Sequence, residues 1–438
     1  MRSILLMMAF FVMVLPALKM PQIGVMIWSW IAFMNPHREA WGGAAKFEFN
    51  MIIAVVTLGA WLFSKEPLKL PKTPMTVLLI IFALHISATT FVAELRDISY
   101  PIWDRTMKSL VLVFAIMGLI NNRVRIHAMI WVIVISLCYW GVKGTGFLIL
   151  SGGSYSIFGP TNSMIFDNNH LAAALIMTIP LVNYLRLHTD NKWIRIGLIV
   201  VMFMTVFAVI GTYSRGGFIG LTMMGLVYWW RSKGKFVGAM AIGLIVIVGL
   251  LAMPQKYFDR INTISNTEED SSFQGRLTMW ETAILIAKAK PLTGVGFRAY
   301  EKQHVFDKFN PGAGHARAIH SIYFETLADH GYPGLILFLS IAFLTWRNSR
   351  WIVKHTRGRP ELAWAHDLGR MMEVSLAGYL VAGAALSLAY YDMYLALVAI
   401  TAILRVVVSR QLTAKPRAIV HPAMAPSTPL PGTARTSH

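Results

Sequence analysis

Long apolar runs separated by short polar segments fill most of this chain. The runs recur from the N-terminus to about residue 408, and they lack the alternation of apolar and polar positions that membrane β-strands show. About 20 apolar residues in a helix cross a hydrocarbon core roughly 30 Å thick. The pattern therefore predicts an all-α, polytopic membrane protein.

The positions of the runs predict the order of the spans. The first 34 residues hold two short runs, Ser3–Leu18 and Ile23–Met34, which are either two short helices or one span plus a shallow piece. Ala17-Leu18-Lys19-Met20 has no small-x-small cleavage site, so we expect the first run to be retained. The later runs predict spans at 48–63, 75–93, 107–120, 127–150, 170–186, 195–212, 217–230, 236–253, 321–346, 371–388 and 391–408.

Charge orients these spans. The net charge is +19, and Lys and Arg gather in five segments that the spans place on one side: 64–72, 121–126, 186–195, 231–235 and 347–370. Basic short loops face the cytoplasm, so the charge reflects membrane orientation and we expect no nucleic-acid partner. Twelve spans, with one in the first 34 residues, also put the N-terminus on the cytoplasmic side, and we prefer that number to thirteen.

The other side receives 94–106, 151–168, 213–216, 254–320 and a turn near Tyr390. We predict one membrane domain over residues 1–410, followed by a disordered cytoplasmic tail over 411–438, which is rich in Pro, Ala and Thr.

Segment 254–320 is a large outward loop. A polar, acidic stretch at Asn262–Ser272 predicts a loop, and the spacing of Trp280, Ile284 and Ala287 predicts an amphipathic helix over 273–289 that lies on the membrane face. Pro291 ends this helix, and the chain re-enters the membrane near His320.

His320 is the strongest catalytic candidate, because it stands where the outward loop meets an apolar helix. A neutral imidazole at a water–membrane boundary can accept a proton from an attacking hydroxyl. Alternatively, His320 caps the helix. His315, Arg317 and Tyr323 lie in the same segment and are further candidates for substrate contact.

Two arginines could bind an anion. Arg215 occupies a tight break between spans, Thr212–Gly217, and Arg276 lies near the start of the predicted loop helix. A guanidinium fork matches phosphate oxygens. The alternatives are a snorkelling Arg215 and a solvated Arg276. Arg298 belongs to the same outward basic surface, which faces either an anionic substrate or lipid headgroups.

Asn169, in Phe166–Ala172, either binds a sugar or caps the helix that follows. Zinc and P-loop motifs are missing from the sequence, and Cys138 is the single cysteine. We therefore expect no metal, no cofactor and no intrachain disulfide.

Three stretches together resemble the bacterial O-antigen ligase and polymerase superfamily. They are Phe166–Ala172, Ser214-Arg215-Gly216, and His320-Ser321-x-Tyr323-x-x-x-Leu327-x-x-x-Gly331-x-x-Gly334, which follows the large outward loop. Gly275-Arg276-x-x-x-Trp280 is similar to a loop motif of that family. The first 150 residues resemble the subgroup of putative O-glycosylation ligases.

The resemblance implies an inverting, metal-independent glycosyltransferase of the bacterial inner membrane. It implies transfer of a glycan from an undecaprenyl diphosphate carrier to an acceptor hydroxyl on the periplasmic face. The acceptor would be lipid A–core or another envelope acceptor, such as a protein or lipid. On this basis Arg215 and Arg276 bind the donor diphosphate and His320 activates the acceptor.

Two other functions stay open from the sequence. A polymerase that extends the repeat unit uses the same donor chemistry. A transporter or flippase carries out no covalent chemistry, but it usually places ionisable residues and broken helices near mid-membrane. The polar residues of this chain gather at the rim instead, which favours an enzyme.

Overall fold

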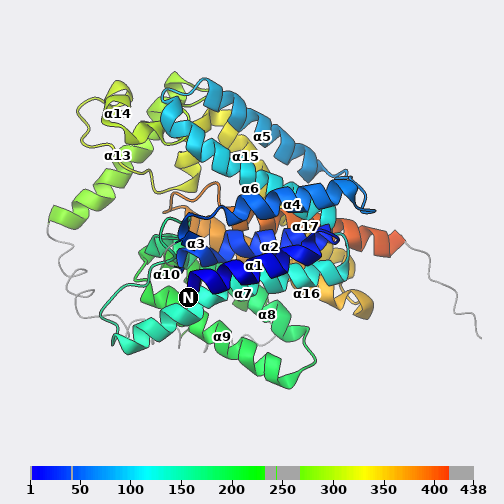
Figure 1. The fold of residues 1–438 in the computed structure, drawn as a ribbon. Coiled ribbons are helices and arrows are strands. Elements are labelled where there is room, and N and C mark those ends of the chain that lie inside the picture. Colours follow the sequence, from blue (N-terminus) through cyan, green and yellow to red (C-terminus); the bar gives the residue numbers. More distant parts are fainter. Residues whose placement is uncertain (1, 41–42, 232–242, 244–266, 414–438) are drawn as a thin grey trace, which may run out of the picture.

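The protein is a bundle of helices that lie side by side along one direction (Figure 1). The computed structural model describes residues 2–40, 43–231, 243 and 267–413. In these residues the regular secondary structure consists of α-helices and short 3₁₀-helices. The all-α, multi-pass class predicted from the apolar runs is therefore confirmed.

Six helices in the described part of the chain are long and apolar enough to cross a membrane. They are α5 (Pro74–Phe91), α7 (Arg123–Leu150), α8 (Asn168–Leu187), α9 (Lys192–Gly211), α15 (Ile322–Thr356) and α17 (Asp392–Thr413). Shorter apolar helices are α1 (Arg2–Ala17), α2 (Pro21–Met34) and α4 (Phe49–Phe63). The other α-helices of the described residues are α3 (Gly43–Lys46), α6 (Arg96–Leu119), α10 (Arg215–Arg231), α13 (Thr267–Ala289), α14 (Gln303–Phe309) and α16 (Ala363–Gly383).

The N-terminal region differs from the preferred arrangement. The first 34 residues form two separate helices, α1 and α2, because Pro21 opens a new helix after the break at Lys19–Met20. In Figure 1, α1 begins at the end of the bundle where α8 and α10 begin, opposite to the side expected for the N-terminus. The span expected at 236–253 lies outside the described residues.

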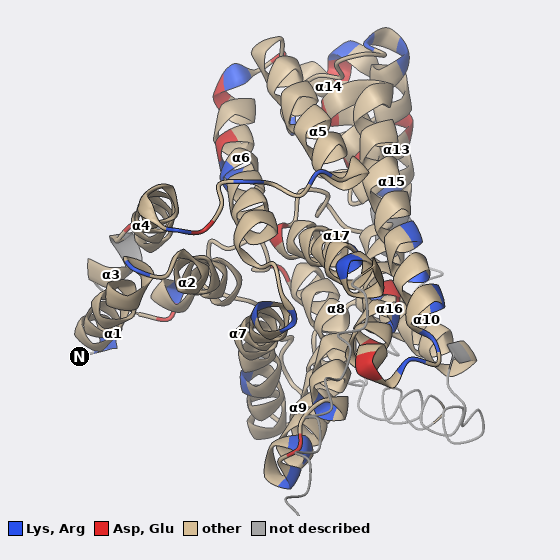
Figure 2. Ribbon diagram, turned by 90° about the vertical axis from the view of Figure 1, so that its right-hand side faces the viewer, with Lys and Arg blue, Asp and Glu red and all other residues tan. Residues whose placement is uncertain are grey.

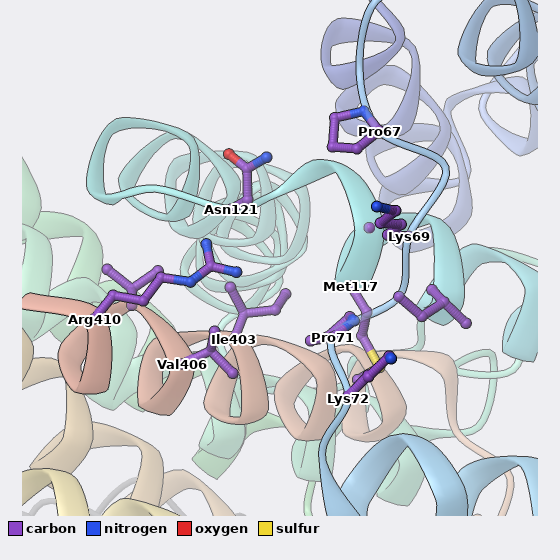
Figure 3. Close-up of a pocket in the computed structure, with 12 residues that line it drawn as sticks. Pro67, Lys69, Pro71, Lys72, Met117, Asn121, Ile403, Val406 and Arg410 are labelled. Atoms are coloured by element: carbon purple, nitrogen blue, oxygen red, sulfur yellow. The ribbon is translucent and has the colours of Figure 1, made fainter.

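Four of the five basic segments meet at one end of the bundle, which we call the basic end. Arg125 pairs with Glu66, Arg123 lies over the ring of Trp364, and His188 pairs with Asp367. A cavity of about 670 Å³ at this end is bordered by Lys69, Lys72 and Arg410 (Figure 3). Figure 2 views the bundle from the basic end and shows Lys and Arg on α9, α15 and α17.

The connections at the opposite end carry the candidate site, so we call it the site end. Glu94 pairs with Lys290 and Lys308, and its N–H donates to the carbonyl of Val295. Helix α6 begins at Arg96 with Pro101 inside it, so most of 94–106 is helix rather than the expected loop.

The segment after residue 267 forms a small core of its own. Helix α13 begins at Thr267, so residues 267–272 are helical rather than part of a loop, whereas 262–266 lie outside the described residues. Its buried side chains, Met279, Ala283 and Ile286, pack with residues of the following loop. Ile284 is 37% exposed. Ala287 is fully buried and Trp280 is half-buried against the same core, so the buried stripe agrees with the predicted one except at Ile284. The stripe packs on protein.

Helix α15 is interrupted at Gly331, and the loop 291–296 forms hydrogen bonds with the backbone groups that the interruption leaves without a partner in the helix. Gly331 has φ 68°, and a side chain there would collide with the carbonyl of Pro291. Pro333 has no N–H, so the carbonyl of Asp329 accepts instead from the N–H of Gly296, at 3.0 Å. Helix α17 continues to Thr413, into the expected tail, and 414–438 lie outside the described residues.

Candidate active site

Two of the sequence motifs form one structure at the site end. The Asn169 side-chain oxygen accepts from the Ser214 hydroxyl at 2.7 Å, and the Asn168 amide donates to the carbonyl of Thr212 at 2.8 Å. Asp167 caps α8 through the N–H of Asn169. Gly217 packs so closely on α8 that a side chain there would meet Ala172. The start of α8 thus fixes the turn that leads into α10.

Arg215 is the first residue of α10 and is exposed. The next residue, Gly216, faces the end of α16, where Ala385 and the carbonyl of Ala382 are its nearest neighbours. The connection between α16 and α17 therefore lies directly beside the arginine turn.

The same connection holds His320. The N–H of His320 donates to the hydroxyl of the buried Ser387 at 2.9 Å, and its φ of 51° turns the chain into α15. Ile322 packs against Gly383, where it occupies the space that a side chain would fill. The end of α16 therefore brings Arg215 and His320 together, although 104 residues lie between them in the sequence.

Helix α13 brings Arg276 to the same place. The indole N–H of Trp280 donates to the carbonyl of Ile319 at 3.0 Å, and its ring stacks on Phe324 with centroids 5.1 Å apart. The guanidinium of Arg317 lies against Gly275, which leaves room for it because it has no side chain. These contacts anchor the helix one turn beyond Arg276.

The charges of these residues act on one another. Burial lowers the pKa of Arg276, and the charge of Arg215 lowers it further. Burial is also the main cause that lowers the pKa of His320, followed by the charge of Arg276, while Asp167 opposes the change. The His320 imidazole is therefore neutral at pH 7, and the arginines make the surroundings cationic. Such a site can bind an anion and accept a proton.

Arg298 is held by acidic side chains. Its guanidinium lies 3.8 Å from the carboxylates of both Glu301 and Glu325. The backbone N–H of Arg298 donates to the Asp329 carboxylate at 2.9 Å. Burial alone would lower the pKa of Arg298, but Glu325 and Glu301 raise it above its ordinary value. Arg298 therefore serves the structure of the loop, and any contact with substrate is an additional role.

The remaining predicted contacts have different surroundings. The hydroxyl of Tyr323 donates to the carbonyl of Leu380 at 2.9 Å and ties α15 to α16. His315 and Arg317 are exposed in the loop that leads to His320. The roles proposed for all of these residues stay predictions.

Sequence reasoning missed the residues that brace His320. Ser387 binds its backbone, and the buried carboxylate of Glu325 accepts from the N–H of Ala389 at 3.0 Å. The Tyr390 hydroxyl donates to Asp329 at 2.9 Å. Two acids one turn apart in an apolar helix, Glu325 and Asp329, were the available signal. No such signal marked Ser387 in the sequence, because serine is a common residue in turns.

Metal-ligating side chains do not gather into a candidate site in the described ranges, where groups of three or more His, Cys, Asp or Glu residues are absent. The cavity bordered by Lys69 lies at the basic end, away from His320.

The fold is that of a multi-pass helical membrane protein with a cationic polar site at one end of the bundle. Residues 198–339 match the family described as O-Antigen ligase. Arg215, Arg276 and His320 all lie inside this match, which confirms the resemblance drawn from their motifs. Residues 1–190 match a family of unknown function (DUF5935).

The chain is also similar to the exopolysaccharide production protein ExoQ of Rhizobium meliloti (strain 1021). The two are 28% identical over 116 residues, which make up 25% of this chain and 26% of that protein. The match thus covers about a quarter of the relative's length.

Proposed function

We propose that the protein transfers a glycan from an undecaprenyl diphosphate carrier to an acceptor hydroxyl. The observation that carries this proposal is the convergence of Arg215, Arg276 and His320 around the end of α16, inside the O-antigen ligase match. The proposed acceptor is lipid A–core or another envelope acceptor.

The proposed reaction is a single displacement with inversion. The acceptor oxygen forms a bond to the anomeric carbon as the bond from that carbon to the diphosphate oxygen breaks. The diphosphate leaves with the electron pair, and Arg215 and Arg276 bind its growing negative charge. The neutral His320 accepts the proton of the acceptor hydroxyl. The step needs neither a metal nor a cofactor, because arginines supply the positive charge and imidazole the base.

In this proposal the bundle spans the bacterial inner membrane. The basic end faces the cytoplasm, in keeping with the distribution of Lys and Arg. The site end, with α13, α14 and the loop that leads to His320, faces the periplasm, where a lipid-linked glycan and an envelope acceptor can meet at the rim.

A second candidate is polymerisation, in which the acceptor is the end of another lipid-linked glycan. The donor chemistry is the same, and the similar protein is named for the production of an exopolysaccharide. Transport without covalent chemistry has less support, since the polar residues gather at one end of the bundle.

The test uses the full-length protein in nanodiscs with a fluorescent oligosaccharide linked to undecaprenyl diphosphate. We expect His320→Ala to fold and to lose transfer to lipid A–core by at least a hundredfold, which is the lower range for a lost general base. The matched control is His304→Ala, because His304 is an exposed histidine on α14. Full transfer by His320→Ala would contradict the proposal. Elongated carrier-linked products without any lipid A–core product would favour the polymerase.

A further inference from the structure

A second, smaller cavity lies next to the candidate active site. Its volume is about 220 Å³, and it is lined by the end of α2, the short 3₁₀-helix Pro36–Arg38 that follows it, the start of α4, the middle of α6, the segment 162–165 and the start of α17. Residues 162–165 lead directly into Asp167, and Tyr391 follows Tyr390, which binds Asp329. Two of the segments that line the cavity are therefore adjacent in sequence to residues that shape the candidate active site.

Four of the residues that line this cavity have a buried polar atom without a hydrogen-bond partner in the described part of the chain. The atoms are His37 Nδ1, Arg38 Nε, Asn50 Oδ1 and the Tyr391 hydroxyl. His37 is 7% exposed and Tyr391 is 2% exposed. More than about 90% of buried polar groups in proteins are hydrogen-bonded, and each one left unsatisfied costs roughly 1–3 kcal/mol. Four such atoms belong to residues around one cavity, so a polar ligand that reaches them would lower this cost.

The atoms suit a molecule with several hydroxyls. Arg38 Nε donates, Asn50 Oδ1 accepts, and the Tyr391 hydroxyl can do either. Burial, with the nearby charge of Arg38, lowers the pKa of His37 to about 4, so its ring is neutral at pH 7 and can also accept or donate. Trp28 adds an apolar wall. A volume of this size holds roughly seven waters at about 30 Å³ each, which corresponds to one sugar ring.

The charges around the cavity favour an anion. Arg38, Arg105 and Lys108 line it, against a single carboxylate, that of Asp392, which caps α17 through the N–H of Met393. Lys108 already pairs with Asp104 at 2.6 Å. Arg38 and Arg105 therefore supply the positive charge of the cavity, and the Asp392 carboxylate balances part of the charge of Arg105. Arg105 is also close enough to Arg298 and Glu325 for their charges to interact, which links the cavity to the surroundings of His320.

We propose that this cavity binds one sugar unit that carries an acidic group, so that His37, Asn50 and Tyr391 bind its hydroxyls and Arg38 and Arg105 bind its acid. The proposal rests on the proposed function, in which the sugar belongs to the glycan or to its acceptor. Most of the lining lies within residues 1–190, outside the O-antigen ligase match. The N-terminal region would thus set substrate preference beside a shared catalytic site.

The first test measures binding of two probes, D-glucuronate and D-glucose, by saturation-transfer NMR on the full-length protein in nanodiscs. We expect glucuronate to bind at least fivefold more tightly than glucose at pH 7. Arg105→Gln should abolish that preference, whereas Arg96→Gln, an exposed arginine on the same helix, should keep it. Equal binding of both probes, or a preference that survives in Arg105→Gln, overturns the acidic specificity.

A conservative pair tests the hydroxyl contacts. Tyr391→Phe removes a single oxygen and should weaken binding of both probes by about fivefold, while Tyr155→Phe, a tyrosine 65% exposed in a loop, should not. Unchanged melting temperatures exclude misfolding as the cause. Unchanged binding by Tyr391→Phe overturns this location for the sugar.

Transfer assays distinguish the two sources of the sugar. If the unit belongs to the donor, Arg105→Gln lowers transfer only from donors that contain glucuronate. If it belongs to the acceptor, the loss follows acidic acceptors. Measuring glucuronate binding in His320→Ala separates this proposal from the catalytic one. If His320→Ala binds glucuronate and keeps full transfer, the catalytic role of His320 is wrong and the cavity proposal stands. If His320→Ala loses transfer and binds no glucuronate, the cavity proposal is wrong and the catalytic role stands.

Discussion

Trp280 donates its indole N–H to the carbonyl of Ile319, the residue immediately before His320, at 3.0 Å. Arg276 lies one helical turn before Trp280, so this bond fixes the distance between an arginine of α13 and the histidine at the start of α15. We expect Trp280→Phe, which keeps the stacked ring on Phe324, to lower transfer roughly threefold to tenfold, the effect of about 1 kcal/mol. Trp193→Phe, at the basic end, is the control. Equal rates for the two variants would remove the positioning role of Trp280.

The pH dependence of transfer should report the ionisation of His320. Its pKa lies below the ordinary value because of burial first and then the charge of Arg276, with Arg298 and Arg317 adding to the effect and Asp167 opposing it. The base must be neutral, so activity is full above this pKa and falls as the pH drops through it, below about 6.5. Arg276→Gln removes one positive charge and should move the acid limb of kcat to higher pH. A limb that stays in place would contradict this assignment.

The hydrogen bond between Ser214 and Asn169 should control binding of the donor. Ser214→Ala and Asn169→Ala each free the turn that carries Arg215, so we expect the KM for the donor to rise more than kcat falls. A double-mutant cycle should give a coupling of about 1 kcal/mol. Additive effects of the two substitutions would show that the bond does not act through Arg215.

Gly331→Ala should destabilise the protein. Its φ of 68° and the close carbonyl of Pro291 leave no room for a side chain, so we expect a loss of roughly 1–3 kcal/mol. The matched substitution is Gly146→Ala in α7, where the added methyl group meets nothing within 4 Å. Thermal unfolding in detergent measures both variants. A Gly331→Ala protein as stable as Gly146→Ala would mean that the loop 291–296 moves aside at little cost.

Transfer should be unchanged after treatment with EDTA, because Arg215 and Arg276 are proposed to hold the charge of the leaving diphosphate. The assay compares the rate before and after chelation, followed by added Mg²⁺. A strict requirement for a divalent cation, restored by Mg²⁺, would remove the argument that two arginines suffice.

Several features were readable from the sequence for a physical reason. Apolar runs that match the thickness of the membrane fix the helices, and the positions of Lys and Arg fix which ends lie together. Helix α6 shows the limit of this reasoning. Its first turns carry Arg96, Asp97, Asp104 and Arg105, which predicted a loop, but the helix extends beyond the apolar run and Lys108 pairs with Asp104 along it.

The sequence by itself determined the helical membrane class, the basic end and the motifs that hold Arg215, Arg276 and His320. Only the tertiary structure decided that the end of α16 lies between Arg215 and His320, that Ser387 holds the backbone of His320, and that His37 and Tyr391 share a cavity. Local patterns report the exposure of each segment to lipid or water. Contacts between segments far apart in the chain depend on how the helices pack, and a serine or glycine at such a contact looks ordinary in the sequence.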